Sequence, residues 1–282
     1  MKGKPRETLG AAVLVGLIPP KASWWTLWAN FSFVTLEFDK KTLEDGVDSA
    51  LASYLKSMTA IRLFCETNEK AFSETSLRFS QILTKLQNPS LEEIEPGPGT
   101  VALTLTEDEV GLLVEVMEDH SHLLVRAEGM VNVMAEIYAV ALFDGLLVDL
   151  YRLCLTFVPQ SLATQQRMVS LEQVMKANDI GSLQGQLITE EVDRFGFSSV
   201  LEQFKSFRSR LGVDVDDLKV IAPLEQIRAR RNIFVHNGGV VNESYLKIAE
   251  GSPIAIGEVL SLEKEELNSD ISALNLAAKS LV

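Results

Sequence analysis

Residues 231–239 read RNIFVHNGG and put an arginine and a histidine near the end of an expected helix. Arg231 precedes His236 by five positions, and the Asn-Gly-Gly that follows favours a helix stop in the left-handed conformation. A histidine side chain, with an ordinary pKa near ~6.5, can take and give a proton at neutral pH. An arginine stays charged and can hold a phosphate with two hydrogen bonds. The pair therefore suits phosphodiester chemistry without a metal.

The same run resembles the signature of the HEPN superfamily, in which an arginine, a polar residue, a few variable positions and a histidine lie on a late helix of an α-helical bundle. Arg231, Asn232 and His236 match this signature position by position. The lead-in, the Asn-Gly-Gly and a Tyr-Leu pair at 245–246 are similar as well. The likeness extends over residues 135–282, roughly half of the chain, and the first half carries no such likeness.

The resemblance implies a metal-independent endoribonuclease that acts on single-stranded RNA in toxin–antitoxin, phage-defence or RNA-processing settings. RNA supplies its own nucleophile, the 2′-hydroxyl, so the protein must deprotonate it, stabilise the phosphorane charge and protonate the leaving 5′-oxygen. His236 is the candidate for proton transfer and Arg231 for charge stabilisation. The expected products carry 2′,3′-cyclic phosphate ends. Asn232 shares a helix face with His236 and could fix the imidazole tautomer or contact the phosphate.

Three further residues are candidates for RNA binding. Arg228 lies four residues before Asn232 and eight before His236, so we expect it to extend the same face toward RNA. Arg230 points elsewhere on the helix, and we expect it at the rim of a groove. Asn237, at the helix end, is the third candidate.

One histidine in the motif cannot act as acid and base at once, and the resemblance implies a homodimer with a composite active site. A plainer interpretation is open for each residue. A histidine at a helix end can cap carbonyls, and arginines in the last turns complement the helix dipole. The rival function is therefore a catalytically inactive HEPN module that binds RNA or a protein partner. A third possibility is a toxin whose antitoxin, or another defence-complex protein, covers the site.

Charge is distributed unevenly along the chain. The 282 residues carry a formal net charge of −13, which argues against broad nucleic-acid binding because phosphate attraction needs a basic surface. Residues 221–247 differ, since this segment contains four basic side chains and only two acidic ones, Glu225 and Glu243. The four are Arg228, Arg230, Arg231 and Lys247.

Cysteine and histidine usage predicts neither a metal site nor a cofactor. Cys65 and Cys154 lie in apolar helical sequence, so we expect buried free thiols and a cytoplasmic protein. His120 and His122 are two positions apart, which directs them to different sides of a helix. The chain also lacks a Gly-rich phosphate loop.

Residues 1–100 are expected to form an N-terminal region that regulates the protein or binds a partner. An apolar run at 9–17 is too short to span a bilayer, and the tryptophans at 24, 25 and 28 are more typical of a core. A strand is predicted over 30–38 and a long helical run over 42–87. The Glu-Pro-Gly-Pro-Gly at 95–99 marks a linker.

Residues 101–282 are expected to form the HEPN-like helical domain, which makes the fold mainly α with room for one or two short strands. Helices are predicted from Thr106 to about Arg126 and over 134–157, the latter a buried bundle helix rather than a membrane span because four charges interrupt it. Further helices are predicted to start at Ser170, at Ser199 and at Leu218, the last with Pro223 in its first turn. A loop or short hairpin is predicted over 250–262, and a last helix over 263–281.

Overall fold

The computed structural model describes residues 40–87, 106–164, 168–211, 218–249 and 253–281. Helices make up 86% of these residues with essentially no strand among them, so the expected mainly α fold is confirmed. Some sequence predictions lie outside the described residues, namely the apolar run at 9–17, the three tryptophans, the strand at 30–38 and the linker at 95–99.

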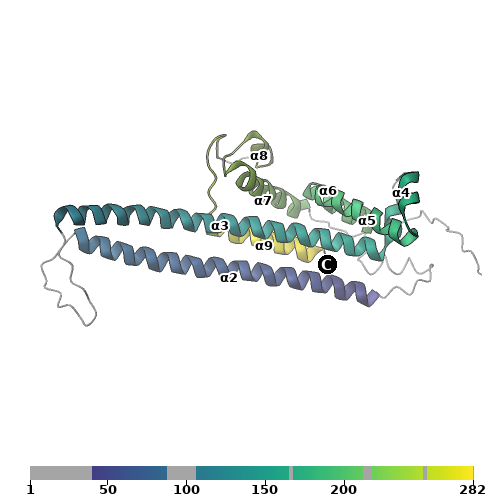
Figure 1. Ribbon diagram of the computed structural model, residues 1–282, viewed down its shortest axis with the longest axis horizontal. Coiled ribbons are helices and arrows are strands. Elements are labelled where there is room, and N and C mark those ends of the chain that lie inside the picture. The colour runs from purple at the N-terminus through teal and green to yellow at the C-terminus, as the bar shows by residue number, and fades with distance from the viewer. Residues whose placement is uncertain (1–39, 88–105, 165–167, 212–217, 250–252, 282) are drawn as a thin grey trace, which may run out of the picture.

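The two longest helices, α2 (Lys40–Gln87) and α3 (Glu107–Phe157), lie side by side in opposite directions (Figure 1). Apolar side chains recur along one face of α2, and Tyr54, Met58 and Ile61 are buried in a core that α3 also lines. At 1.5 Å per residue, the 48 residues of α2 span roughly 72 Å. One end of this hairpin therefore extends past the shorter helices (Figure 1).

α3 joins the two helical runs that the sequence predicted at its start and its end. The start is confirmed as a capping box: the Thr106 hydroxyl accepts a hydrogen bond from the Glu109 N–H, and the Glu109 carboxylate accepts one from the Thr106 N–H at 2.7 Å. Gly129 lies inside the helix rather than at a break. α2 runs alongside this part of α3, and residues 65–72 of α2 and 128–132 of α3 line one cavity.

Shorter helical segments follow α3 in the chain. Ser170 and Ser199 cap helices as predicted, since each side chain accepts a hydrogen bond from the N–H three residues later. The last predicted helix, over 263–281, is also confirmed. The segments are η1 (Pro159–Thr164), α4 (Leu171–Lys176), α5 (Ile180–Gly196), α6 (Val200–Leu211), α7 (Leu218–Asn237), α8 (Glu243–Ile248) and α9 (Lys264–Ser280).

α3 is the central helix of the bundle. α9 packs against α2, α3 and α7, and α5, α6 and α7 each contact α3 as well (Figure 1). Tyr151 of α3 stacks on Phe195 with ring centroids 4.0 Å apart, and Phe207 meets both rings edge-on. The core thus ties α5 and α6 to the C-terminal half of α3.

Among the described helices, α3 alone combines a length and an apolar composition sufficient to cross a bilayer. A core helix has the same two properties, and Leu147, Tyr151 and Leu155 of α3 are fully buried in this bundle. Length and composition alone therefore carry little weight for a membrane span.

A second, smaller apolar cluster forms where α7 ends. Ile233, Val241, Tyr245 and Leu260 are among its buried residues, which come from α7, α8 and the segment before α9. The predicted loop or short hairpin over 250–262 has a single isolated bridge in its described part, between Val240 and Val259. This cluster holds the end of α7 in place.

Candidate functional site

α7 carries the predicted catalytic residues and is packed along one side. Ile221, Leu224 and Ile227 are buried in the main core, and Ile233 is buried in the smaller cluster. Pro223 lies inside the helix, beyond the first turn in which the sequence predicted it. α7 starts at Leu218, so the proline removes one backbone donor near its N-terminal end and leaves the last turns intact.

The predicted stop of α7 is confirmed. Gly238 and Gly239 have φ values of +60° and +84°, which glycine adopts readily because it has no Cβ. The Gly239 N–H donates to the Ile233 carbonyl at 3.1 Å. Asn237 takes part in the same turn, since its side-chain amide donates to the Val240 carbonyl. The side-chain amide nitrogen of Asn237, a predicted RNA-binding residue, is thus engaged in closing the turn.

Arg231 is turned toward α3, where it meets Asp144. Its Nη2 lies 2.9 Å from Asp144 Oδ2, and the side chain keeps 23% of its surface exposed. Arg228 binds the same carboxylate, with Nη2 2.5 Å from Oδ1, and its Nη1 donates to the Ser198 carbonyl at 3.1 Å. One aspartate therefore bridges the predicted catalytic arginine and a predicted RNA-binding arginine.

His236 and Asn232 are exposed on a different side of α7. Positions five apart on a helix are separated by about 140°, whereas positions four apart nearly coincide. Arg231 and His236 thus point apart within one chain, and Asn232 and His236 share a face. Among the described residues, no hydrogen bond joins Asn232 to His236, so the expected tautomer contact is not made here.

Arg230 does not lie at a groove rim as the sequence predicted, because it is buried. Its Nε lies 3.0 Å from Glu136 Oε1, and its other nitrogens contact Glu266 and Asp270 of α9. Burial raises the pKa of Glu136 to about 7 and that of Asp270 to about 6, while the charge of Arg230 opposes both shifts. Arg230 therefore ties α7 to α3 and α9.

The basic run of the sequence is consequently not a bare cationic surface. Each of Arg228, Arg230 and Arg231 is paired with a carboxylate from α3 or α9. One of these carboxylates, Asp144, is a partner that the local sequence does not indicate. The residue lies 87 positions before Arg231, and no local pattern marks the pairing.

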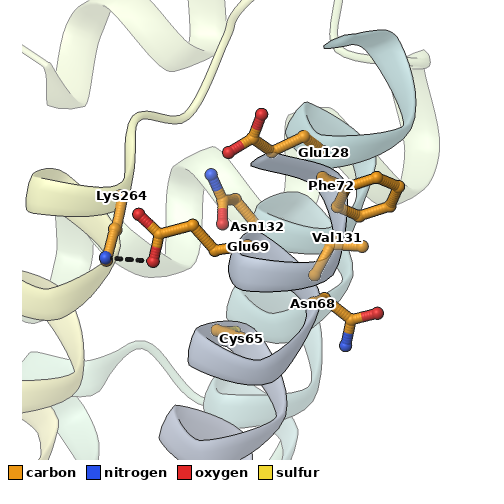
Figure 2. A pocket seen from close by; sticks show the side chains of 8 residues that line it. All are labelled: Cys65, Asn68, Glu69, Phe72, Glu128, Val131, Asn132 and Lys264. Carbon is orange, nitrogen blue, oxygen red and sulfur yellow. Dashed lines mark hydrogen bonds and ion pairs between the residues drawn. The ribbon is translucent and has the colours of Figure 1, made fainter. Parts of the chain in front are cut away.

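Two hollows lie elsewhere on the molecule. Figure 2 shows a cavity of about 20 Å³ between α2, α3 and the start of α9, where Lys264 reaches Glu69 beside Cys65. Such a volume accommodates about one water molecule. A shallow groove of about 340 Å³ lies between α3 and α5, lined in part by Arg152 and Thr189. Neither hollow includes Arg231 or His236.

Both cysteines are free thiols, as expected. Cys154 is buried, and burial raises its pKa to about 12. Cys65 is only partly buried, at the edge of the cavity in Figure 2, and burial raises the pKa of its thiol too. A raised pKa keeps a thiol protonated and unreactive.

Comparisons with family models, with curated proteins and with solved structures find no match to this chain. The functional argument therefore depends on the residues of α7 and on their contacts.

Proposed function

We propose that the chain is a HEPN-like endoribonuclease that cleaves single-stranded RNA without a metal and leaves 2′,3′-cyclic phosphate ends. The observation that carries this proposal is the arrangement at the end of α7. Arg231 is held by a carboxylate of α3 and is partly exposed, and His236 is exposed five residues later. We further propose a cytoplasmic toxin–antitoxin or phage-defence role.

In this mechanism His236 removes the proton of the 2′-hydroxyl or supplies one to the leaving 5′-oxygen. Arg231 binds the non-bridging phosphate oxygens and stabilises the charge that develops on them. Asn232 lies on the face of His236 and is exposed, so it can hydrogen-bond RNA or the imidazole once substrate is bound. No step requires a cofactor.

A second copy of the chain completes the site in this proposal. Arg231 and His236 of one copy diverge by about 140° around α7, and each copy supplies one motif histidine. Exposed apolar side chains are available on both α3 and α7. Met134 and Tyr138 on α3 are 64% and 57% exposed, and Val235 on α7 is 46% exposed. Their burial would stabilise a dimer.

The first test is cleavage of a mixed pool of single-stranded and transfer RNA in EDTA. Wild-type protein is expected to give cyclic-phosphate ends, and His236→Ala and Arg231→Ala to lose at least about 100-fold in rate, since proton transfer and charge stabilisation each contribute on that scale. His122→Ala is the matched control, because His122 is also exposed but lies on α3 outside the site. Cleavage that survives in His236→Ala would overturn the proposal.

The second candidate function is a catalytically inactive module that binds RNA or a protein partner. The pairing of all three α7 arginines with carboxylates favours it, as does the net charge of −13. Such a module would cleave no RNA and would keep its partner through His236→Ala and Arg231→Ala. Co-purification of wild type and both variants with the same protein, in the absence of cleavage, would decide for this function.

A further inference from the structure

Asp144 joins two guanidinium groups at the surface. Its two oxygens accept hydrogen bonds from Arg228 Nη2 at 2.5 Å and from Arg231 Nη2 at 2.9 Å. The Ser198 carbonyl fixes Arg228 from the other side. The side chains of Arg228, Asp144 and Arg231 keep 16%, 25% and 23% of their surface exposed. An anion in solution can therefore approach all three.

The carboxylate has the chemistry of the ligand that the site is proposed to bind. A carboxylate and a phosphodiester each present two charged oxygens, and arginine binds both through a pair of donors on one edge. The Nε and Nη2 donors of Arg231 lie on one such edge. Asp144 uses only Nη2 because its other oxygen is drawn to Arg228.

The remaining donor on that edge is unused. Arg231 Nε is buried and has no hydrogen-bond partner in the described part of the chain. Leaving such a donor unpaired costs free energy, and the cost is larger on a charged group. A phosphodiester that replaced the carboxylate on Arg231 would bind Nη2, and it would also reach Nε once the guanidinium turned outward, because Nε is shielded from solvent while Asp144 is bound.

We propose that Asp144 is a positioning residue that stands in for the substrate phosphate. It holds Arg228 and Arg231 together as a two-arginine clamp and yields Arg231 to the phosphodiester when RNA binds. This inference rests on the proposed function, because it assigns the phosphate-binding group of that site. The three side chains carry a net charge of +1 with the carboxylate and +2 without it. Asp144 therefore lowers the affinity for a polyanion while it sets the geometry for cleavage.

Asp144→Asn separates these two effects. The probe for binding is a single-stranded 2′-O-methyl RNA oligonucleotide, which lacks the nucleophile and cannot be cleaved. Its Kd is expected to fall about 3- to 10-fold, and the salt dependence of log Kd to steepen by about 0.7, because one more phosphate is neutralised. Cleavage at saturating RNA is expected to slow about 10-fold because the two arginines lose their register. A merely structural role for Asp144 would not tighten binding.

Three other variants control the result. Asp149→Asn removes the same charge from an exposed position on the same helix and should change neither quantity. Asp144→Glu keeps the charge and should restore wild-type affinity, with partial recovery of the cleavage rate. Arg228→Gln serves if Asp144→Asn fails to fold. It removes one arm of the clamp, so Kd should rise about 3- to 10-fold and the salt dependence should become shallower by about 0.7.

The outcomes separate this inference from the proposed function. Tighter binding by Asp144→Asn, with a wild type that cleaves no RNA, supports the clamp and removes the nuclease. Cleavage by wild type, with unchanged binding in both Asp144→Asn and Arg228→Gln, removes the clamp and keeps the nuclease. Weaker binding by Asp144→Asn, or an absence of binding by every variant, also overturns the clamp.

Discussion

Arg230 faces three carboxylates, which together carry more negative charge than one guanidinium neutralises. Glu136 has no exposed surface, and Asp270 is also buried, so water does not offset the excess. Burial disfavours the charged forms and raises the pKa of Glu136 to about 7 and that of Asp270 to about 6; the neighbouring carboxylates add to both shifts, and Arg230 opposes them. The folded chain thus binds protons that the unfolded chain has released.

This excess of bound protons predicts how stability depends on pH. For Glu136 the ordinary pKa is 4.5 and the folded value is about 7, so its contribution is present below pH 4.5 and is lost as pH rises to about 7. We expect Glu136→Gln, which resembles the protonated form, to flatten this decline. The free energy of unfolding of Glu136→Gln minus that of wild type should be about 1–3 kcal/mol larger at pH 8 than at pH 5, as measured by urea unfolding. Glu118→Gln, exposed on the same helix, is the control. Parallel pH profiles for wild type and Glu136→Gln would contradict the argument.

Contacts at this scale were the least predictable from sequence. The positions of Arg228, Arg230 and Arg231 on their helix follow from the 3.6-residue repeat, but the residues opposite them do not. Whether Asp144 or Glu136 meets a given arginine depends on how α3 and α7 cross. Burial of Arg230 is set by α9, which begins 34 residues later in the chain.

At the scale of the element, local signals predicted helix ends well and helix continuity less well. The starts at Thr106, Ser170 and Ser199 depend on a side chain that binds the N–H three residues on, so the sequence contains the whole interaction. The continuity of α3 through Gly129 has no such local signal, and α3 packs along α2 there. Packing there outweighs the weak helix propensity of glycine.

Two glycines test this contrast between local conformation and packing. Gly239→Ala should destabilise the fold by about 1–2 kcal/mol, because the residue has φ +84° and an added Cβ would lie 3.4 Å from Val259. Gly129→Ala should stabilise it by about 0.5–1 kcal/mol, since α3 is helical there and the Cβ meets no atom within 4 Å. Urea unfolding of both variants measures the two changes. If both substitutions changed the free energy of unfolding by the same amount in the same direction, the backbone conformation at each glycine would not determine the effect.

At the scale of the whole molecule, the periodicity of the sequence predicted a bundle but not its arrangement. The apolar spacing along α2 indicated a helix with one buried face, and it left open whether the chain itself or a partner covers that face. The structure pairs α2 with α3 and α9. The same reasoning leaves Met134, Tyr138 and Val235 as apolar groups that the described chain does not cover.

A shared site makes activity depend on the composition of the dimer, because both copies must supply His236. The test is to mix wild type with His236→Ala at a constant total concentration, allow the subunits to exchange, and measure RNA cleavage. Activity should then follow the square of the wild-type fraction, so an equal mixture should retain about a quarter of the rate instead of about half. His122→Ala as the mixing partner should leave the rate unchanged, since it keeps His236. A linear dependence on the wild-type fraction, in protein shown by sedimentation to have exchanged subunits, would mean that each chain carries a complete site.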